Sequence, residues 1–278
     1  MSYVNATYTT SDGTVYDVSG RKGMLLVTSA ALGWERTYTS AGFDGTERKL
    51  SGSLAFADAS HMAEANDLMA RCALDMDNFT PGTLEVDGWK LRCFIASASA
   101  TTATPMQRTW DVDLVAPDPT WYRETRYEFM PASGTSSDMG GIDHEYDFPH
   151  DYGSTARGWK LEVASIAPCD FRLTIYGYAA KPSIYIGGNR YGADVTVPAG
   201  GLLVIDSTKK RSMKGDSVVL SDRYGNSQDV FAKRVRGAEG SGSYIYERIK
   251  HGTHDVTWDQ GWGFSLDLIE RAVAIPWT

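Results

Sequence analysis

The chain has 278 residues, of which 42% are hydrophobic and 12% aromatic, and its net charge is −8. This length exceeds what one hydrophobic core usually serves, so two domains are predicted. An acidic chain without basic clusters argues against binding to nucleic acid, because phosphates need cationic partners. No run approaches the roughly 20 apolar residues of a membrane helix, so no membrane insertion is expected.

The charge and the cysteines give two further expectations. Residues 1–124 contain 10 Lys/Arg and 16 Asp/Glu, a net of −6, whereas residues 125–278 contain 17 and 19, a net of −2. Cys72, Cys93 and Cys169 form no CxxC pair, so we expect buried, reduced thiols. The N-terminus lacks the charged and apolar regions of a signal peptide, and we therefore expect synthesis in a cytoplasm.

Short strands separated by glycine-containing turns are predicted for the first part of the chain. The alternation of apolar residues places them at 14–18, 24–28, 34–38 and 51–56. One helix follows at 61–74. Its apolar residues recur at spacings of three and four and form a single stripe: Met62, Ala65, Leu68, Met69 and Cys72.

Residues 81–124 predict a hairpin and a third strand. The pair Asp87-Gly88 is typical of a tight turn between two alternating strands. A strand at 110–116 ends at Pro117, because proline cannot donate to a β-ladder. The sequence therefore predicts a first domain at 1–124 that is mainly β and has one covering helix.

The second predicted domain, 125–278, begins with a segment that has no periodicity. Its residues 133–153 are rich in glycine and serine and predict a long loop. Nine short strands then recur about every ten residues, which is typical of a β-sandwich or jelly roll. They are predicted at 160–166, 171–176, 183–186, 194–197, 202–206, 217–220, 244–249, 254–257 and 264–269.

Four histidines are candidate metal ligands. His251 and His254 are separated by two residues, and His144 and His150 lie in the aperiodic segment. A zinc site needs three or four ligands in a fixed geometry. We expect His251 and His254 to be residues of a turn between two strands, and we predict no metal site.

No catalytic or cofactor site is predicted either. The chain has no Gly-x-Ser-x-Gly motif and no phosphate-binding glycine loop. Paired carboxylates of a glycosidase remain conceivable, but strand alternation already explains most Asp and Glu residues as solvated surface. The sequence therefore does not predict an enzyme.

Aromatic residues of the second domain offer two interpretations. Large rings usually fill cores and turns, and this is the first expectation. The alternative is a platform on which a sugar stacks, as in carbohydrate-binding sandwiches. Its members would be Tyr176, Tyr178, Tyr185, Tyr191, Trp258 and Trp262.

Several stretches resemble one known family. GTLEVDGWKLRCFIASAS (82–99) followed by WDVDLVAPDPTWYRE (110–124) is similar to the end of the N-terminal domain of the distal tail protein (Dit) family of siphovirus-type phages and prophages. The second half continues the resemblance in VTVPAGGLLVIDSTKKRSM (195–213), GSYIYERIKHGTHDVTW (242–258) and ERAVAIPWT (270–278). The resemblance thus touches both predicted domains.

The resemblance implies a structural role without catalysis. Dit proteins form a hexameric ring between the tail tube and the tip of the virion. Their N-terminal belt domain, a β-sandwich or split barrel, builds the ring, and a galectin-like or jelly-roll domain projects from it. The implied partners are further copies, the tail tube protein, the tape-measure protein and the tail-associated tip protein.

Three hypotheses of function therefore follow from the sequence. The first is the ring component of a phage tail tip, assembled in the host cytoplasm. The second is a β-sandwich module that binds a cell-surface glycan, and the third is a glycoside hydrolase with unrecognised carboxylates. Particle size tests the first hypothesis, glycan binding the second and reducing-sugar release the third.

Overall fold

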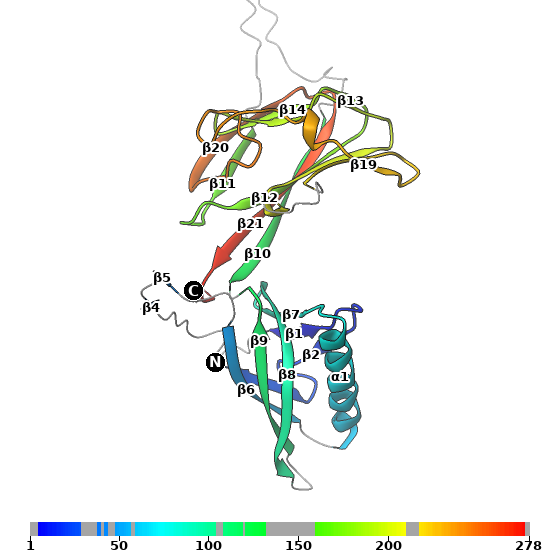
Figure 1. Cartoon of the computed structure of the whole chain (residues 1–278), viewed down its shortest axis with the longest axis vertical. Helices are drawn as coiled ribbons and strands as arrows, with labels where there is room; N and C mark the ends of the chain where they lie inside the picture. The colour runs from blue at the N-terminus through cyan, green and yellow to red at the C-terminus, as the bar shows by residue number, and fades with distance from the viewer. Residues whose placement is uncertain are drawn as a thin grey trace, which may run out of the picture. The chain divides into compact units, whose positions relative to one another are not determined.

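The computed structural model describes residues 5–28, 38–39, 42–43, 48–56, 59–103, 108–118, 120–131, 159–209 and 217–275. The chain divides into two compact units (Figure 1). The first comprises Met1–Arg123 and Arg271–Thr278, and the second Glu124–Glu270. The sequence placed 271–278 in the second domain, but these residues group with the first unit, where Ile275 is buried in the core.

The first unit contains one α-helix among its described residues. Its elements are β1 (Ala6–Thr9), β2 (Val15–Asp17), β3 (Met24–Thr28), β4 (Tyr38–Thr39), β5 (Gly42–Phe43), β6 (Arg48–Phe56), α1 (Ala59–Asp77), β7 (Gly82–Val86), β8 (Trp89–Ala103), β9 (Arg108–Ala116) and the start of β10 (Trp121–Phe129).

The long strand β8 belongs to two runs of antiparallel strands. Its first part pairs with β7, which continues to β1 and β2. Its later part pairs with β9, which continues to β6 and β3 (Figure 1). The apolar side chains of these strands and of the helix form one core. A mainly β unit with one covering helix is therefore confirmed.

Helix α1 packs on β8 and β6 through the stripe that the sequence predicted. Ala65 and Leu68 are fully buried, and Met62 and Met69 are partly buried against the same core. The helix is longer than the predicted 61–74 at both ends. The buried Asp75 carboxylate anchors its last part, because it accepts hydrogen bonds from the backbone N–H and the hydroxyl of Ser11.

The described residues of the second unit form strands and two 3₁₀ turns. Its elements are the end of β10, β11 (Trp159–Val163), β12 (Asp170–Tyr176), β13 (Ala179–Ala180), β14 (Ser183–Ile186), β15 (Asn189–Gly192), β16 (Thr196–Val197), β17 (Leu202–Asp206), η2 (Ser207–Lys209), β18 (Val218–Ser221), β19 (Ser227–Asp229), η3 (Phe231–Lys233), β20 (Gly252–Trp258) and β21 (Gly263–Ala272).

Two antiparallel sheets face each other in this unit. One has the strand order β19-β18-β17-β12-β21-β10, and the other has the order β11-β20-β14-β15. Buried side chains of both sheets, among them Phe171 and Leu266 from one and Leu161 and Ile184 from the other, belong to a single core. This is the architecture of a β-sandwich. The predicted fold class is confirmed in this respect, whereas the closer likeness to galectins stays a prediction.

One predicted strand is wrong. Residues 244–249 form turns, with a single bridge from Ile249 to Cys169. Ile245 and Tyr246 are adjacent and both buried, so the apparent alternation is not that of a strand. Asn189 holds this segment instead, because its side chain bonds both the N–H and the carbonyl of Tyr244.

Other elements were not predicted. Strands β1, β5, β10, β13, β15 and β19 have no counterpart among the sequence expectations. The predicted strand 34–38 lies outside the described residues except for Tyr38, which belongs to β4. The predicted loop 133–153 lies entirely outside them.

Candidate interaction surfaces

The histidines that were weighed as ligands do not form a metal site in the described part of the chain. His251 lies in a bend, but His254 lies within β20, which corrects the expectation that both belong to a turn. The Nε2 atom of His254 is 2.7 Å from the carbonyl oxygen of Lys250. No group of three or more His, Cys, Asp or Glu residues within the described ranges could hold a metal ion. His144 and His150 lie outside these ranges.

All three cysteines are free and buried, as predicted. Burial raises the pKa of the Cys72 and Cys93 thiols to about 12, and it also raises the pKa of Cys169. A thiol is nucleophilic only after it loses its proton. These side chains therefore act as small apolar groups of the two cores.

The six aromatic residues named as a possible platform do not share one surface. Tyr191 is buried in the core, where its hydroxyl donates to the carbonyl of Glu247. Tyr176 donates to Glu128, while Tyr178 is exposed. The other three, Tyr185, Trp258 and Trp262, line one pocket of the second unit.

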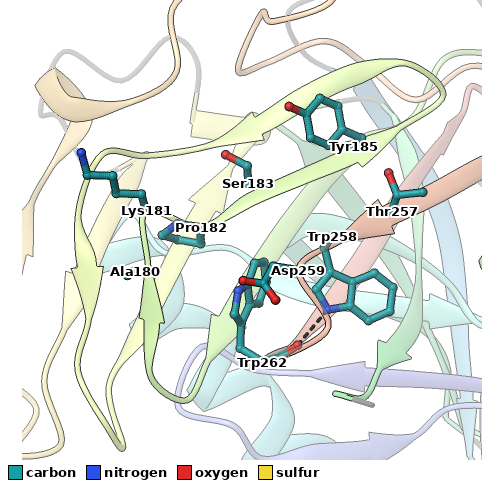
Figure 2. Close-up of a pocket in the computed structure, with 9 residues that line it drawn as sticks. All are labelled: Ala180, Lys181, Pro182, Ser183, Tyr185, Thr257, Trp258, Asp259 and Trp262. Atoms are coloured by element: carbon teal, nitrogen blue, oxygen red, sulfur yellow. Dashed lines mark hydrogen bonds between the residues drawn. The ribbon is translucent and has the colours of Figure 1, made fainter.

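This aromatic pocket lies where β14 and β20 pair (Figure 2). It is lined by Ala180, Lys181, Pro182, Ser183, Tyr185, Thr257, Trp258, Asp259 and Trp262, and its volume is about 360 Å³. Tyr185 is the cross-strand partner of Thr257, and Ile184 is that of Trp258. Neighbouring residues of a strand point to opposite faces of the sheet. Tyr185 therefore lies on the outer face and is exposed, whereas Ile184 and its partner Trp258 are directed into the sandwich.

The tryptophans form the part of the pocket wall that is attached to the core. The indole N–H of Trp258 donates to the carbonyl of Trp262 over 2.8 Å, as Figure 2 shows. The Trp258 ring also meets Phe264 edge to face at 5.2 Å and Phe129 at 5.8 Å. The sequence identified these residues only because they are aromatic. The register of β14 with β20 is what brings them to one pocket.

The first unit has a different kind of surface, on the later half of β8. Residues 96–101 are all exposed, and the stretch 96–103 consists only of alanine, serine and threonine. One edge of this half pairs with β9. The opposite edge pairs with β7 only as far as Cys93, and within the described ranges no strand continues that pairing. We call residues 96–103 the β8 edge.

An edge of this kind is a template for another strand. Most exposed edges carry lysine, proline or a bulge that prevents pairing with other molecules. The β8 edge carries neither charge nor proline, although its register with β9 shifts near Ile95 and near Ala100. It can therefore accept main-chain hydrogen bonds from a partner.

Among the described residues, no helix combines the length and the apolar character needed to cross a membrane. The aromatic pocket and the β8 edge are two features of the described residues that could contact other molecules. The pocket is formed by strands that are distant in the sequence, β14 and β20, whereas the β8 edge belongs to a single strand.

The fold defines a class of protein, namely a chain of two β units of which the first carries a covering helix. No protein-family model matches the sequence, and no curated protein is significantly similar to it. Solved structures of similar fold do exist, and they include chains of a phage baseplate and a phage Dit protein.

A chain of the phage P2 baseplate in its activated conformation with calcium matches with a TM-score of 0.56 and 14% identity, covering 98% of this chain and 99% of that chain. A chain of the same baseplate with strontium matches with a TM-score of 0.55 and 14% identity, again covering 98% of this chain and 99% of that chain. The Dit protein of phage SPP1 matches with a TM-score of 0.50 and 12% identity, covering 96% of this chain and 99% of that chain. That protein is described as a paradigm of the hub adsorption apparatus in phages that infect Gram-positive hosts. The resemblance to Dit proteins noted in the sequence is confirmed at the level of the fold.

Proposed function

We propose that this chain is a structural component of a phage or prophage tail tip, in which copies form a hexameric ring. The observation that carries the proposal is the shared fold with SPP1 Dit, which spans 96% of this chain and 99% of that one. A likeness that includes both units and the passages between them is more informative than a match of one β-sandwich, because isolated sandwiches serve many functions.

In this proposal the first unit forms the ring. A closed ring is built from head-to-tail contacts, in which every copy uses two different surfaces. The β8 edge suits one of them, because a strand edge without charge can be covered by a neighbouring copy. The net charge of −6 on residues 1–124 also suits a ring through which DNA passes, because like charges repel.

The partners follow from the same proposal. The ring would lie at the tail tip of the virion, after assembly in the host cytoplasm, and would contact the tail tube, the tape-measure protein and the tail-associated tip protein. The second unit would project from the ring. The role is structural and requires no catalysis.

Light scattering on the full chain over a range of concentrations tests the proposal, together with electron microscopy of the particles in negative stain. We expect rings of six copies, either at high concentration or after addition of purified tail tubes. A chain that stays monomeric at every concentration and does not bind tail tubes would contradict the proposal.

A pair of variants makes the test specific. Ala98→Lys places a charge on the β8 edge, which should reduce ring formation because charged edges resist pairing. Leu74→Lys places the same charge on the exposed side of α1 and serves as the control. If both variants assemble equally, the β8 edge is not part of the contact between copies. The ring itself is tested separately, by the mass of the particles.

A further inference from the structure

We propose that the aromatic pocket binds the ring of a sugar. This inference concerns the second unit alone and does not depend on the ring proposed for the first. It rests on the shape of the pocket, on the rigidity of its walls, and on the kind of polar groups around it.

The size of the pocket suits a small ligand. Its volume of about 360 Å³ lies near the lower end of the range of small-molecule sites, roughly 300–1,000 Å³. Tyr185 is 43% exposed and offers much of its ring to solvent, whereas Trp258 and Trp262 are only 8% and 5% exposed. Tyr185 therefore supplies the open aromatic surface, and the tryptophans supply the edges of the wall.

An aromatic surface of this kind matches one face of a pyranose. The ring faces of aromatic side chains carry partial negative charge. The C–H bonds on one face of a pyranose carry slight positive charge, so that face packs on an aromatic ring while the hydroxyl groups point sideways. A purely apolar ligand would leave the polar rim of the pocket without partners, at a cost in free energy.

The walls are held in place before any ligand arrives. The hydrogen bond from Trp258 to Trp262 and the contact of Trp258 with Phe264 fix one side. On the other side Lys181 has a φ of 49°, a conformation rare for residues other than glycine, and its N–H donates to the carbonyl of Val195 over 2.8 Å. The next residue, Pro182, is buried. A preformed site loses little conformational entropy on binding.

The polar groups of the rim match sugar hydroxyls. The hydroxyl oxygen of Ser183 accepts from the Nε atom of Arg190 at 3.0 Å and from a terminal guanidinium nitrogen at 2.9 Å, so its own proton remains available to donate. One carboxylate oxygen of Asp259 accepts from the N–H of Gly261 over 3.1 Å. The second oxygen accepts no other hydrogen bond from the described residues. A carboxylate can accept from two neighbouring hydroxyl groups at once.

The charges of the rim balance one another. Lys181 is paired with Asp194, which lies outside the pocket, over 3.1 Å. Arg190 is the cross-strand partner of Tyr185 and bonds Ser183, while Asp259 has no cationic partner among the ion pairs of the described residues. These two cations and two anions sum to zero, so the rim offers both donors and acceptors to a sugar without excluding either charge.

The experiment is saturation-transfer NMR on the full chain with galactose, N-acetylglucosamine, glucosamine and glucuronate, each at millimolar concentration. We expect transfer from the aromatic protons of the protein to the ring protons of at least one of these sugars. Asp259→Asn should weaken that transfer, because the amide has only one oxygen that accepts from hydroxyl groups, whereas the carboxylate has two.

Variants locate the binding. Tyr185→Ala should weaken binding at least tenfold, and Thr257→Lys, which extends a long side chain beside Tyr185, should also weaken it. Tyr178→Ala removes an exposed tyrosine that does not line the pocket and should leave binding unchanged. Thermal melting of each variant verifies that it is folded.

Three outcomes would overturn the inference: no transfer to any of the four sugars, binding that survives Tyr185→Ala, or selective binding of a proline-rich peptide without any sugar. Each of these is read from the NMR spectrum, whereas failure of the proposed ring is read from particle mass. The two proposals can therefore fail separately.

Discussion

Two leucines of α1 show how a single side chain acquires its role from its position. Leu68 is fully buried, whereas Leu74, six residues further along the same helix, is 59% exposed. The stripe at spacings of three and four includes Leu68 and leaves Leu74 outside it. The same residue type is therefore a core residue at one position and a surface residue at the other.

Replacing Leu68 with Asp should destabilise the first unit by roughly 3–5 kcal/mol, because it leaves an unpaired charge in the core. Leu74→Asp, the matched control, should change the free energy of unfolding by no more than about 0.5 kcal/mol. Denaturant unfolding of the full chain measures both. Equal stability of the two variants would show that the helix does not dock through this stripe.

The three thiols allow a second prediction at this scale. Because burial raises the pKa of Cys72 and Cys93 to about 12 and raises that of Cys169, all three stay protonated at pH 8. A thiol-specific reagent such as dithionitrobenzoate should therefore not react with the native chain, and it should react with all three thiols in denaturant. Rapid labelling of the native chain would mean that a thiol is accessible.

At the scale of elements, the second unit depends on a close approach between two backbones. Strand β15 ends at Gly192, where a Cβ atom would lie 2.2 Å from the carbonyl oxygen of Pro182 and 3.1 Å from the Cα atom of Ser183. Both neighbours are backbone atoms, so no side-chain rotation can relieve the clash. This approach also sets the position of two residues that line the aromatic pocket.

Gly192→Ala should consequently destabilise the second unit by roughly 1–3 kcal/mol or more, in the range of overpacked sites. Gly261→Ala is the control, because its nearest neighbour would be the Asp259 carboxylate at 3.4 Å, an ordinary contact. Thermal unfolding of the full chain compares the two. A Gly192→Ala variant as stable as the control would mean that the strands can separate at little cost.

At the scale of the whole molecule, the chain enters and leaves the second unit through β10 and β21. At the last two residues of β21 the chain rejoins the first unit, where Arg271 forms an ion pair with Asp118 at 3.1 Å. Ile275 is buried in the core of that unit. The first unit is therefore made of two segments that are separated by the entire second unit.

Ile275→Ala should destabilise the first unit by about 2–5 kcal/mol, the usual cost of a cavity in a core. Val273→Ala, at an exposed position two residues earlier, should have a much smaller effect. Hydrogen exchange resolved by peptide assigns the loss to one unit. Increased exchange confined to the second unit would contradict the grouping of the last residues with the first.

The sequence determined the class of the fold because the signals of class are local. Alternation with a period of two predicted strands such as β14 and β17, and the period of 3.6 predicted the helix with its buried stripe. Where burial does not alternate, these signals fail. Between its two buried ends β10 has only half-buried and exposed residues, and it is a strand because β8 and β21 pair with it.

Only the tertiary structure decided which residues meet. The sequence offered six aromatic residues of the second unit as the members of one platform, and the structure brings three of them to one pocket. The reason is the register of β14 with β20, which places Tyr185 opposite Thr257 although 72 residues separate them, since 257 − 185 = 72. In the same way Ile275 joins a core built mainly by residues before Arg123. Local periodicity indicates which face of its own helix or strand a residue occupies, whereas the pairing of distant strands is a property of the folded chain.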